Sequence, residues 1–513
     1  MSMYTRITLQ GVNLDVDPID LPPDVWTEAT NMVPEPGSMA RANGYREVFP
    51  TPLFPPYYLQ YTPQLNEPYW LYAGRTNIAV IDPAAAHSDI TPGGTLPAVP
   101  ENGWSGGNLS GLAVVNSAET GPYYWFNGIG PEALTLPGQR PNTRYRVMRP
   151  FKYHLVGMVV IGESSEIPDE LHWSDASDPG QIPATWVPAA DNEAGDNILA
   201  DENGAIIDGM SLRDSFFIYK QDSVYEMTYV GGNSVMRFRK VFGTVGILTQ
   251  NCVVRVKGTH IVLGNGDIYQ HDGQNIKSLA DGVIRDTFFA TIDDTYYRNS
   301  FAVYLEAKEE VWFCVPTTGS ERPNLALVYS VDTGTFGYRQ LPDADFAATG
   351  IIAVDGTAPV EDWDTDAQAW NEDTTSWLNQ TLSVTEDAIL IADADGEKLY
   401  QGDTGTTADG VGYGSSVGRL GLDLQDPQRE KAIRRIWPRI NAPADAAFTL
   451  ELFNQRDPMA GQEVVGSYNF VPGTEGVAVN VNARYLGMRI STEDNVAWSL
   501  GGVDIEYLPR GGF

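Results

Sequence analysis

The sequence has little positive charge. Its 513 residues contain 33 Lys and Arg against 67 Asp and Glu, which gives a formal net charge of −34. Proteins that coat nucleic acid need many cationic side chains to displace the counterions of the phosphates. The charge balance therefore argues against a general DNA- or RNA-coating protein, while it leaves open a protein past which DNA merely moves.

Cysteines and long apolar runs are also scarce. Cys252 and Cys314 are the two cysteines, and because both lie in strand-like runs we expect buried free thiols rather than a disulfide. The longest aliphatic stretch, at 155–161, is far shorter than the roughly 20 residues that cross a bilayer. The first twenty residues lack the apolar core of a secretory signal. We expect no membrane insertion and folding under cytoplasm-like conditions.

Helical periodicity is hardly present. Apolar residues come in short runs bounded by Gly, Asp, Asn and Pro, which is typical of strands and turns. Three segments, at 215–225, 260–269 and 388–400, share one pattern of an apolar strand, a turn with Gly or Asp, and an aromatic residue in the next strand. Each predicts a β-hairpin, because Gly, Asn and Asp tolerate the positive φ that tight turns require.

The spacing of these hairpins predicts a β-propeller. Tyr225, Tyr269 and Trp312 follow one another at 44 and 43 residues, and Tyr400 lies 88 residues further on, which we interpret as two more steps. A period of this size is typical of propeller blades. We expect an all-β fold with six or seven blades over residues 61–405, carrying acidic insertions. A row of β-sandwich domains is the competing interpretation.

The two end segments differ from this repetitive body. Residues 1–60 are rich in proline, which favours an extended N-terminal arm lying across neighbouring molecules. After a Gly-rich break, residues 406–513 alternate in the manner of a compact C-terminal β-sandwich that contacts other subunits. Its expected core aromatic residues are Trp437, Phe453, Tyr485 and Trp498.

Charge is segregated along the chain. The segments 153–212 and 340–397 contain many carboxylates but no Lys or Arg. Their acidic residues include Asp191, Glu193, Asp196, Asp201, Glu202, Asp362, Asp364 and Asp366. The second segment also has Trp363, Trp370 and Trp377 at seven-residue intervals without a coiled-coil pattern, so we predict a surface insertion there. Cations gather in two short runs, namely Arg140, Arg144, Arg146, Arg149 and Lys152, and Arg429, Lys431, Arg434, Arg435 and Arg439.

Motifs for catalysis or metal binding are few. The segment 414–418 matches G-x-S-x-G, but its flanks are not a strand and a helix, and no histidine follows it. The five histidines lack the spacing of a metal site. We interpret residues 393–397 as a hairpin turn, with an adventitious divalent ion as the alternative. We therefore expect no catalytic residue, no cofactor and no resident metal, and a protein that is not an enzyme.

Three stretches of the chain resemble one protein family. They are GVNLDVDPIDLPPDVWTEATNM with GSMARANGYREVF near the start, the segment from LHWSDASDPGQ to GNGDIYQHDGQNIK, and the ending ARYLGMRISTEDNVAWSLGGVDIEYLPRGGF. These phrases resemble the podovirus tail nozzle proteins of bacteriophages, also described as tail tubular or head-to-tail stabilisation proteins. The resemblance implies a hexameric ring of propellers below the portal and the adaptor, around the exit channel for DNA. It also implies a virion tail location after assembly in the host cytoplasm.

The charge pattern agrees with such a conduit. A channel should not grip the DNA that passes, and carboxylates repel phosphates. We expect the two acidic segments to line the channel or to form outer loops, with DNA in transit and not specifically bound. The run from Arg429 to Arg439 is expected to contact acidic neighbours, either another subunit or the adaptor; an amphipathic element with solvated arginines is the alternative. Tail fibre or needle proteins are further expected partners.

Two other interpretations stay open at this point. Trp363, Trp370 and Trp377 offer rings on which sugars stack, so a carbohydrate-binding or glycan-degrading propeller for host attachment is the alternative function. The acidity also suits solubility in a saline habitat, without any role in DNA transit.

Overall fold

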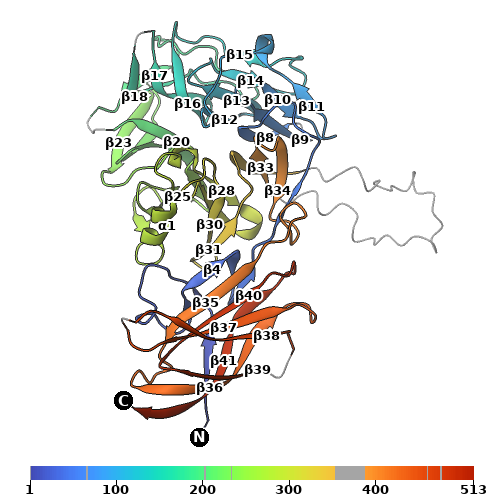
Figure 1. The fold of residues 1–513 in the computed structure, drawn as a ribbon. Helices are drawn as coiled ribbons and strands as arrows, with labels where there is room; N and C mark the ends of the chain where they lie inside the picture. The colour runs from blue at the N-terminus through green and yellow to red at the C-terminus, as the bar shows by residue number, and fades with distance from the viewer. Residues whose placement is uncertain are drawn as a thin grey trace, which may run out of the picture.

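A seven-bladed β-propeller occupies one end of the molecule and a β-sandwich the other, with both chain termini at the sandwich end (Figure 1). The computed structural model describes residues 2–64, 67–163, 165–200, 204–232, 234–352, 387–458, 460–473 and 476–512. Within these residues the only α-helix is α1 (Arg285–Thr291), and three short 3-10 helices are present. The all-β class and the propeller with its appended sandwich are as the sequence predicts.

Each of blades 1 to 6 has four antiparallel strands in chain order, with the first strand innermost. The outer strand of blade 6 also pairs with β5 (Met32–Glu35), so its sheet continues into the sandwich. The strands of blades 1 to 3 are β8 (Tyr58–Gln64), β9 (Glu67–Ala73), β10 (Ile78–Ile81), β11 (His87–Asp89), β12 (Trp104–Leu109), β13 (Leu112–Ser117), β14 (Tyr123–Trp125), β15 (Leu134–Thr135), β16 (Arg144–Phe151), β17 (His154–Ile161), β18 (Glu166–Trp173) and β19 (Gly195–Ile198). Those of blades 4 to 6 are β20 (Ile206–Leu212), β21 (Ser215–Lys220), β22 (Val224–Tyr229), β23 (Met236–Phe242), β24 (Val253–Val256), β25 (Thr259–Leu263), β26 (Ile268–His271), β27 (Ile276–Ser278), β28 (Phe301–Leu305), β29 (Glu310–Val315), β30 (Leu325–Ser330) and β31 (Thr335–Gln340).

Blade 7 is built from both halves of the chain. Its strands are β32 (Phe346–Gly350), β33 (Ala388–Asp393), β34 (Lys398–Gly402) and, on the outside, β7 (Tyr45–Glu47). The innermost strand β32 contacts β8 of blade 1, so the ring of blades is closed. Because the last blade takes its outer strand from the beginning of the chain, backbone hydrogen bonds hold the closure, and radial repetition leaves only short sheet edges.

The three hairpins predicted from turn chemistry are confirmed as the middle strands of blades 4, 5 and 7. The interpretation of the last interval as two steps is wrong. Trp312 lies in β29, the second strand of blade 6, and Tyr400 lies in β34, the third strand of blade 7. The two residues therefore belong to adjacent blades, and the interval is long because residues 353–386, which lie outside the described residues, stand between β32 and β33.

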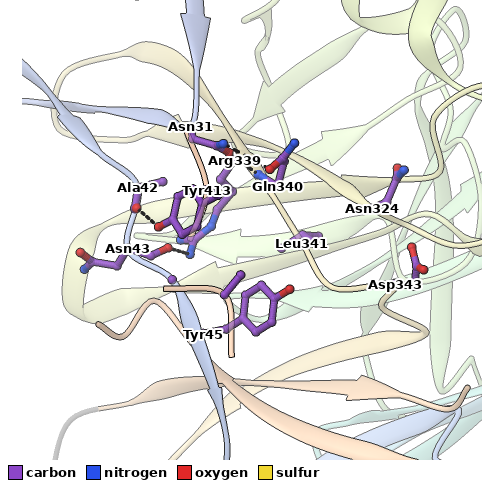
Figure 2. Close-up of a pocket in the computed structure, with 12 residues that line it drawn as sticks. Asn31, Ala42, Asn43, Tyr45, Asn324, Arg339, Gln340, Leu341, Asp343 and Tyr413 are labelled. Carbon is purple, nitrogen blue, oxygen red and sulfur yellow. Dashed lines mark hydrogen bonds between the residues drawn. The ribbon is translucent and has the colours of Figure 1, made fainter. Parts of the chain in front are cut away.

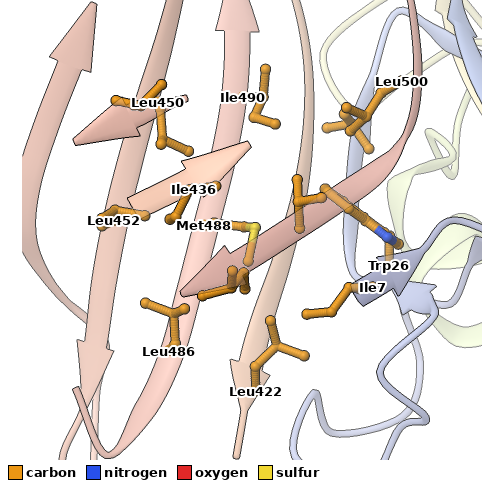
Figure 3. Packing of buried hydrophobic residues seen from close by; sticks show 14 of the residues in the cluster. Ile7, Trp26, Leu422, Ile436, Leu450, Leu452, Leu486, Met488, Ile490 and Leu500 are labelled. Carbon is orange, nitrogen blue, oxygen red and sulfur yellow. The ribbon is translucent and has the colours of Figure 1, made fainter. Parts of the chain in front are cut away.

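The sandwich consists of two sheets that enclose one apolar core (Figure 3). One sheet has the order β38-β37-β40-β35-β4, and the other contains β39, β36 and β41 with β1 and β6 alongside β41. The strands are β1 (Met3–Thr8), β4 (Glu28–Thr30), β5 (Met32–Glu35), β6 (Ser38–Arg41), β35 (Ser415–Leu422), β36 (Arg429–Asn441), β37 (Phe448–Gln455), β38 (Glu463–Phe470), β39 (Val477–Ala483), β40 (Tyr485–Thr492) and β41 (Ser499–Gly512); a small parallel pair, β2 (Gly11–Val12) and β3 (Val25–Trp26), adjoins them.

Of the four aromatic residues predicted for this core, only Trp498 belongs to the main apolar cluster. Phe453 and Tyr485 are buried outside it, and Trp437 is half-buried on the outer side of its sheet. The cluster is instead dominated by aliphatic residues, such as Leu450 and Ile490 (Figure 3). Leu and Ile suit the space between two sheets because they interdigitate in few rotamers.

The prediction that residues 1–60 form an arm across neighbouring molecules is wrong. These residues supply strands to both domains of their own chain, through the pairs β1–β41, β4–β35 and β7–β34. The proline-rich segment 18–22 wraps around the buried guanidinium of Arg419, which donates to the carbonyls of Pro18, Leu21 and Pro22 at 2.9–3.2 Å. A buried arginine needs acceptors for its N–H groups, and the carbonyls of this partly exposed segment supply them.

Candidate functional site

An arginine at the axis of the propeller joins four blades. Arg149 of β16 makes two hydrogen bonds of 2.8 Å to the carboxylate of Asp208 in β20. The same guanidinium donates to the carbonyl of Gly106 in β12 (3.1 Å) and to Oδ1 of Asn251, just before β24 (2.6 Å). Asp208 is 1% exposed and also accepts the backbone N–H of Asn251 at 2.8 Å. Blades 2, 3, 4 and 5 are thereby connected through one ion pair.

Aromatic rings complete this axial hub from the other three blades. Phe346 of blade 7 lies 5.1 Å from Tyr58 of blade 1 and 5.3 Å from Phe301 of blade 6, measured between ring centroids. Burial raises the pKa of Tyr58 to about 12, against the effect of the neighbouring Arg149. Side chains from all seven blades therefore meet at the axis.

A second polar cluster lies where the N-terminal segment enters the propeller, around a pocket of about 280 Å³ (Figure 2). Arg339 of β31 is 2% exposed and stacks over the ring of Trp312 at 3.8 Å. Its two terminal nitrogens contact Oδ1 of Asp403 (3.1 Å) and the carbonyl of Asn43 (2.6 Å). Lys308 also contacts Asp403 at 2.6 Å. We call Arg339, Asp403 and Lys308 the latch.

The pocket is bordered by contacts that hold blades 6 and 7, the N-terminal segment and the sandwich together. Asn31 accepts the backbone N–H of Gln340 (2.9 Å) and donates to the carbonyl of Gly414 (2.8 Å). Tyr413 donates its hydroxyl proton to the carbonyl of Ala42 at 2.5 Å. Next to them, a Cβ on Gly44 would lie 1.8 Å from a backbone oxygen, so only glycine fits at that position. The polar side chains of this pocket serve the junction between the domains.

Two buried histidines link blades 4 and 5. The backbone carbonyl of Ser211 accepts a hydrogen bond from Nε2 of His260, and the backbone N–H of Gly273 donates to Nδ1 of His271. These contacts assign the tautomers, so that His271 Nε2–H donates to the Tyr219 hydroxyl (2.7 Å), which donates in turn to Nδ1 of His260 (2.6 Å). Burial, with the charge of His271 adding to it, lowers the pKa of His260 to about 3, and burial lowers the pKa of His271 to about 4.

This network predicts that acid destabilises the propeller. Unfolded histidine has a pKa near 6.5, so between pH 6.5 and 4 the unfolded chain binds more protons than the folded one and stability falls with the pH. From pH 8 to pH 5 each imidazole should cost about 2 kcal/mol of unfolding free energy. Urea denaturation of wild type, His271→Gln and His260→Gln/His271→Gln at both pH values checks this. The stability gap between wild type and each variant should narrow on acidification, and an unchanged gap would contradict the assignment.

The predicted cationic contact residues all lie in β36, but they are not equivalent. Arg429 and Arg434 are exposed, while Arg435 and Arg439 are half-buried. Lys431 is fully buried; its ammonium donates to the carbonyls of Asp426 and Arg484, and burial lowers its pKa to about 8. Lys431 therefore cannot reach a neighbouring molecule, because its side chain points into the sandwich between backbone carbonyls.

The described acidic candidates lie at the outer edge of blade 3. Asp191 is exposed in the loop before β19. Glu193 accepts the Tyr229 hydroxyl at 2.7 Å, and Asp196 pairs with Arg140 at 2.8 Å. These residues are far from the axial hub, so they suit the outer-loop interpretation. The remaining candidates lie outside the described residues; they are Asp201, Glu202, Asp362, Asp364 and Asp366, and the same holds for Trp363, Trp370 and Trp377.

The minor motifs have plain structural explanations. Ser415 and Ser416 lie within β35, where the Ser415 hydroxyl accepts from the Trp498 indole at 2.8 Å, so this segment is not a strand–turn–helix elbow. Asp393 accepts the N–H of Gly396 at 2.8 Å in the turn between β33 and β34, as predicted. Both cysteines are free and buried. Among the described residues no group of three or more His, Cys, Asp or Glu is placed to hold a metal ion.

Three buried arginines that join distant segments, Arg149, Arg339 and Arg419, are not apparent as such in the sequence. The sequence presents Arg149 only as one member of a cationic run, and no motif distinguishes Arg339 or Arg419. A signal was present for Arg149, because it stands next to an apolar strand pattern in which a charged residue needs a buried partner. The partner, Asp208, could not be identified because nothing in the local sequence brings β16 beside β20.

Comparisons with known proteins give a likeness of shape only. No protein family and no curated protein sequence matches this chain. Among solved structures, the WD40 β-propeller domain of Doa1 is 10% identical (TM-score 0.37), with 70% of this chain and 96% of that chain covered. A fungal alcohol oxidase of the AA5 family, in complex with copper, is 9% identical (TM-score 0.40), with 91% of this chain and 99% of that chain covered. PorZ of the Porphyromonas gingivalis type-IX secretion system is 9% identical (TM-score 0.35), with 76% of this chain and 44% of that chain covered.

In the described parts of the chain, no helix has both the length and the apolar character needed to cross a bilayer.

Proposed function

We propose that this protein is a structural component of a bacteriophage tail, a nozzle in which several copies form a ring that genomic DNA passes on leaving the particle. The observation that carries this proposal is the meeting of the two end segments whose sequences resemble podovirus nozzle proteins. Glu28 makes a two-pronged ion pair with Arg489 (2.8 and 2.9 Å), and Arg41 donates to the carbonyl of Val496 (3.0 Å). Segments more than 400 residues apart in sequence therefore form one construction.

Several residues of the opening phrase make contacts at the junction between the propeller and the sandwich. The segment 18–22 surrounds Arg419, Asn31 bridges blade 6 and the sandwich, and Gly44 allows a close backbone approach at the junction. The phrase thus describes how a sandwich is fastened to a propeller whose ring closes with an N-terminal strand. This supports the resemblance as a likeness of architecture, because composition alone would not place these residues at the junction.

Charge and rigidity also favour a conduit. The net charge of −34 makes the surface repel phosphates, so DNA in transit is not retained. The filled axial hub and the composite blade 7 give a wall element that cannot open without breaking backbone pairing. A passage between copies, and not within one, is what a ring of such propellers provides.

Imaging of intact particles tests the proposal. Particles carrying an epitope on this chain should bind the antibody in a ring at the tail, with the same symmetry in every particle. A uniform ring by negative stain of the purified protein is the matching result in solution. Label on peripheral attachment structures, together with binding of the purified chain to a glycan array, would contradict the nozzle and favour the carbohydrate-binding alternative.

A further inference from the structure

Among the described residues, four strands of the sandwich pair on one side only, namely β1, β4, β38 and β39, and two of them, β1 and β38, have the features of a contact surface. β1 pairs only with β41, and β38 pairs only with β37, within the described part of the chain. An unpaired edge presents a row of free N–H and C=O groups to other chains, and proteins usually protect it with proline, lysine or a cover. Neither MYTRIT of β1 nor EVVGSYNF of β38 contains a proline or a lysine.

Both edges also expose large apolar side chains. On β1, Met3 is 48% and Tyr4 is 68% exposed; on β38, Val464 is 57% and Val465 is 37% exposed. Tyr4 lies beside Trp437 of β36, with ring centroids 6.1 Å apart. Exposed aromatic and aliphatic residues on an open edge favour aggregation of a monomer, whereas in an interface their burial contributes binding energy. These two strands therefore have the properties of surfaces that are covered in an assembly.

The two edges lie on opposite sides of the sandwich. β1 lies beyond β41, at one end of the order β1-β41-β36-β39, whereas β38 contacts β39 at the other end. The two strands carry opposite charges, Arg6 on β1 and Glu463 on β38. Each side chain stays mostly exposed beside a partner of its own chain, Asp504 at 2.8 Å and Arg456 at 3.5 Å respectively. Pairing of like edges would oppose like charges and stop at a dimer, whereas pairing of unlike edges repeats from copy to copy.

We propose that copies of this chain join edge to edge, with β1 of one copy adding a strand to β38 of the next. This inference rests on the proposed ring and names the contact that connects its subunits. Strand addition supplies main-chain hydrogen bonds between rigid bodies, and the exposed apolar residues of each edge are buried against the neighbour. The partner is a second copy because the chain itself offers both halves of the contact.

Cysteine cross-linking tests this contact directly. The two native cysteines are buried and free, so a new cysteine on an edge is the accessible thiol. Met3→Cys or Tyr4→Cys is mixed with Val464→Cys or Val465→Cys, and the mixture is mildly oxidised. Opposed residues of paired strands lie within the distance that a disulfide can bridge. At least one mixture should yield about tenfold more disulfide-linked dimer than a control in which Val411→Cys replaces one of the two edge variants. Strand pairing raises the effective concentration of the two thiols.

A second variant removes the contact without touching the core. Val464→Lys/Val465→Lys places charge on the β38 edge, so this variant should sediment as a monomer under conditions in which the wild type forms oligomers. Val411→Lys, at another exposed valine, should form oligomers as the wild type does. A wild-type chain that stays monomeric, or cross-links at control level in samples that contain rings, would overturn the edge contact. Neither result decides the nozzle proposal, which falls only if particle imaging places the chain elsewhere.

Discussion

Arg149→Met is expected to lower the unfolding free energy of the propeller by about 3–5 kcal/mol, because it leaves the buried carboxylate of Asp208 without its cation. The loss should exceed that of an ordinary core substitution of equal volume, since Arg149 also satisfies the Gly106 carbonyl and the Asn251 side chain. Urea denaturation followed by tryptophan fluorescence measures it.

Arg146→Met is the matched control for this experiment. Arg146 lies in the same strand and pairs with Glu166 at 2.6 Å, but both side chains are largely exposed. Exposed pairs contribute about 0–1 kcal/mol, so this variant should remain close to wild type. Arg149→Met/Asp208→Leu should recover part of the loss, because the orphan charge is gone. Equal stability of Arg149→Met and Arg146→Met would refute the hub as the element that joins the blades.

Arg339→Met is expected to open the closure of the ring locally. The substitution removes the stacking on Trp312 and the contacts to Asp403 and the Asn43 carbonyl, and the cost should be about 3 kcal/mol, since Lys308 still faces Asp403. Amide hydrogen exchange should rise specifically in β7 and β34, the strands that the latch holds together. The inner strands of blades 2 to 5 should keep their protection.

Two further variants separate charge from geometry at the latch. Arg339→Lys retains the charge but loses the planar fork, so its effect should fall between wild type and Arg339→Met. Arg46→Met, in β7 itself, removes only hydrogen bonds to the side chain of Gln401 and should leave the exchange of β34 nearly unchanged. Faster exchange throughout the propeller in Arg339→Met, with no preference for β7, would contradict a local latch.

The blades and their hairpins were predictable because they depend on short-range properties. The turn at 264–267 and the turn at 393–397 contain the Gly and Asp residues that tight turns require, and the structure has hairpins at both places. The apolar runs around them have strand length and period. The prediction for residues 1–60 fails for the same reason, since proline content describes local stiffness and not the partner against which a segment packs.

What each edge of the sandwich can contact was also outside the reach of sequence reasoning. Val464 and Val465 look like half-buried residues of an ordinary strand, and only the sheet order shows that β38 has a neighbour on one side alone. The run from Arg429 to Arg439 looked like one cationic surface, whereas the alternation along β36, broken by bulges, buries Lys431 and exposes Arg434.

The sequence by itself determined the all-β class, the repeated hairpins, the division into a repetitive body and a terminal sandwich, and the excess of negative charge. These follow from φ preferences, strand periodicity and composition, which act over a few residues. The tertiary structure alone decided that β7 closes the ring, that Arg149 meets Asp208 at the axis, and that β1 and β38 remain open. The physical reason is that burial and pairing depend on which distant segments pack together, and that is a property of the whole chain.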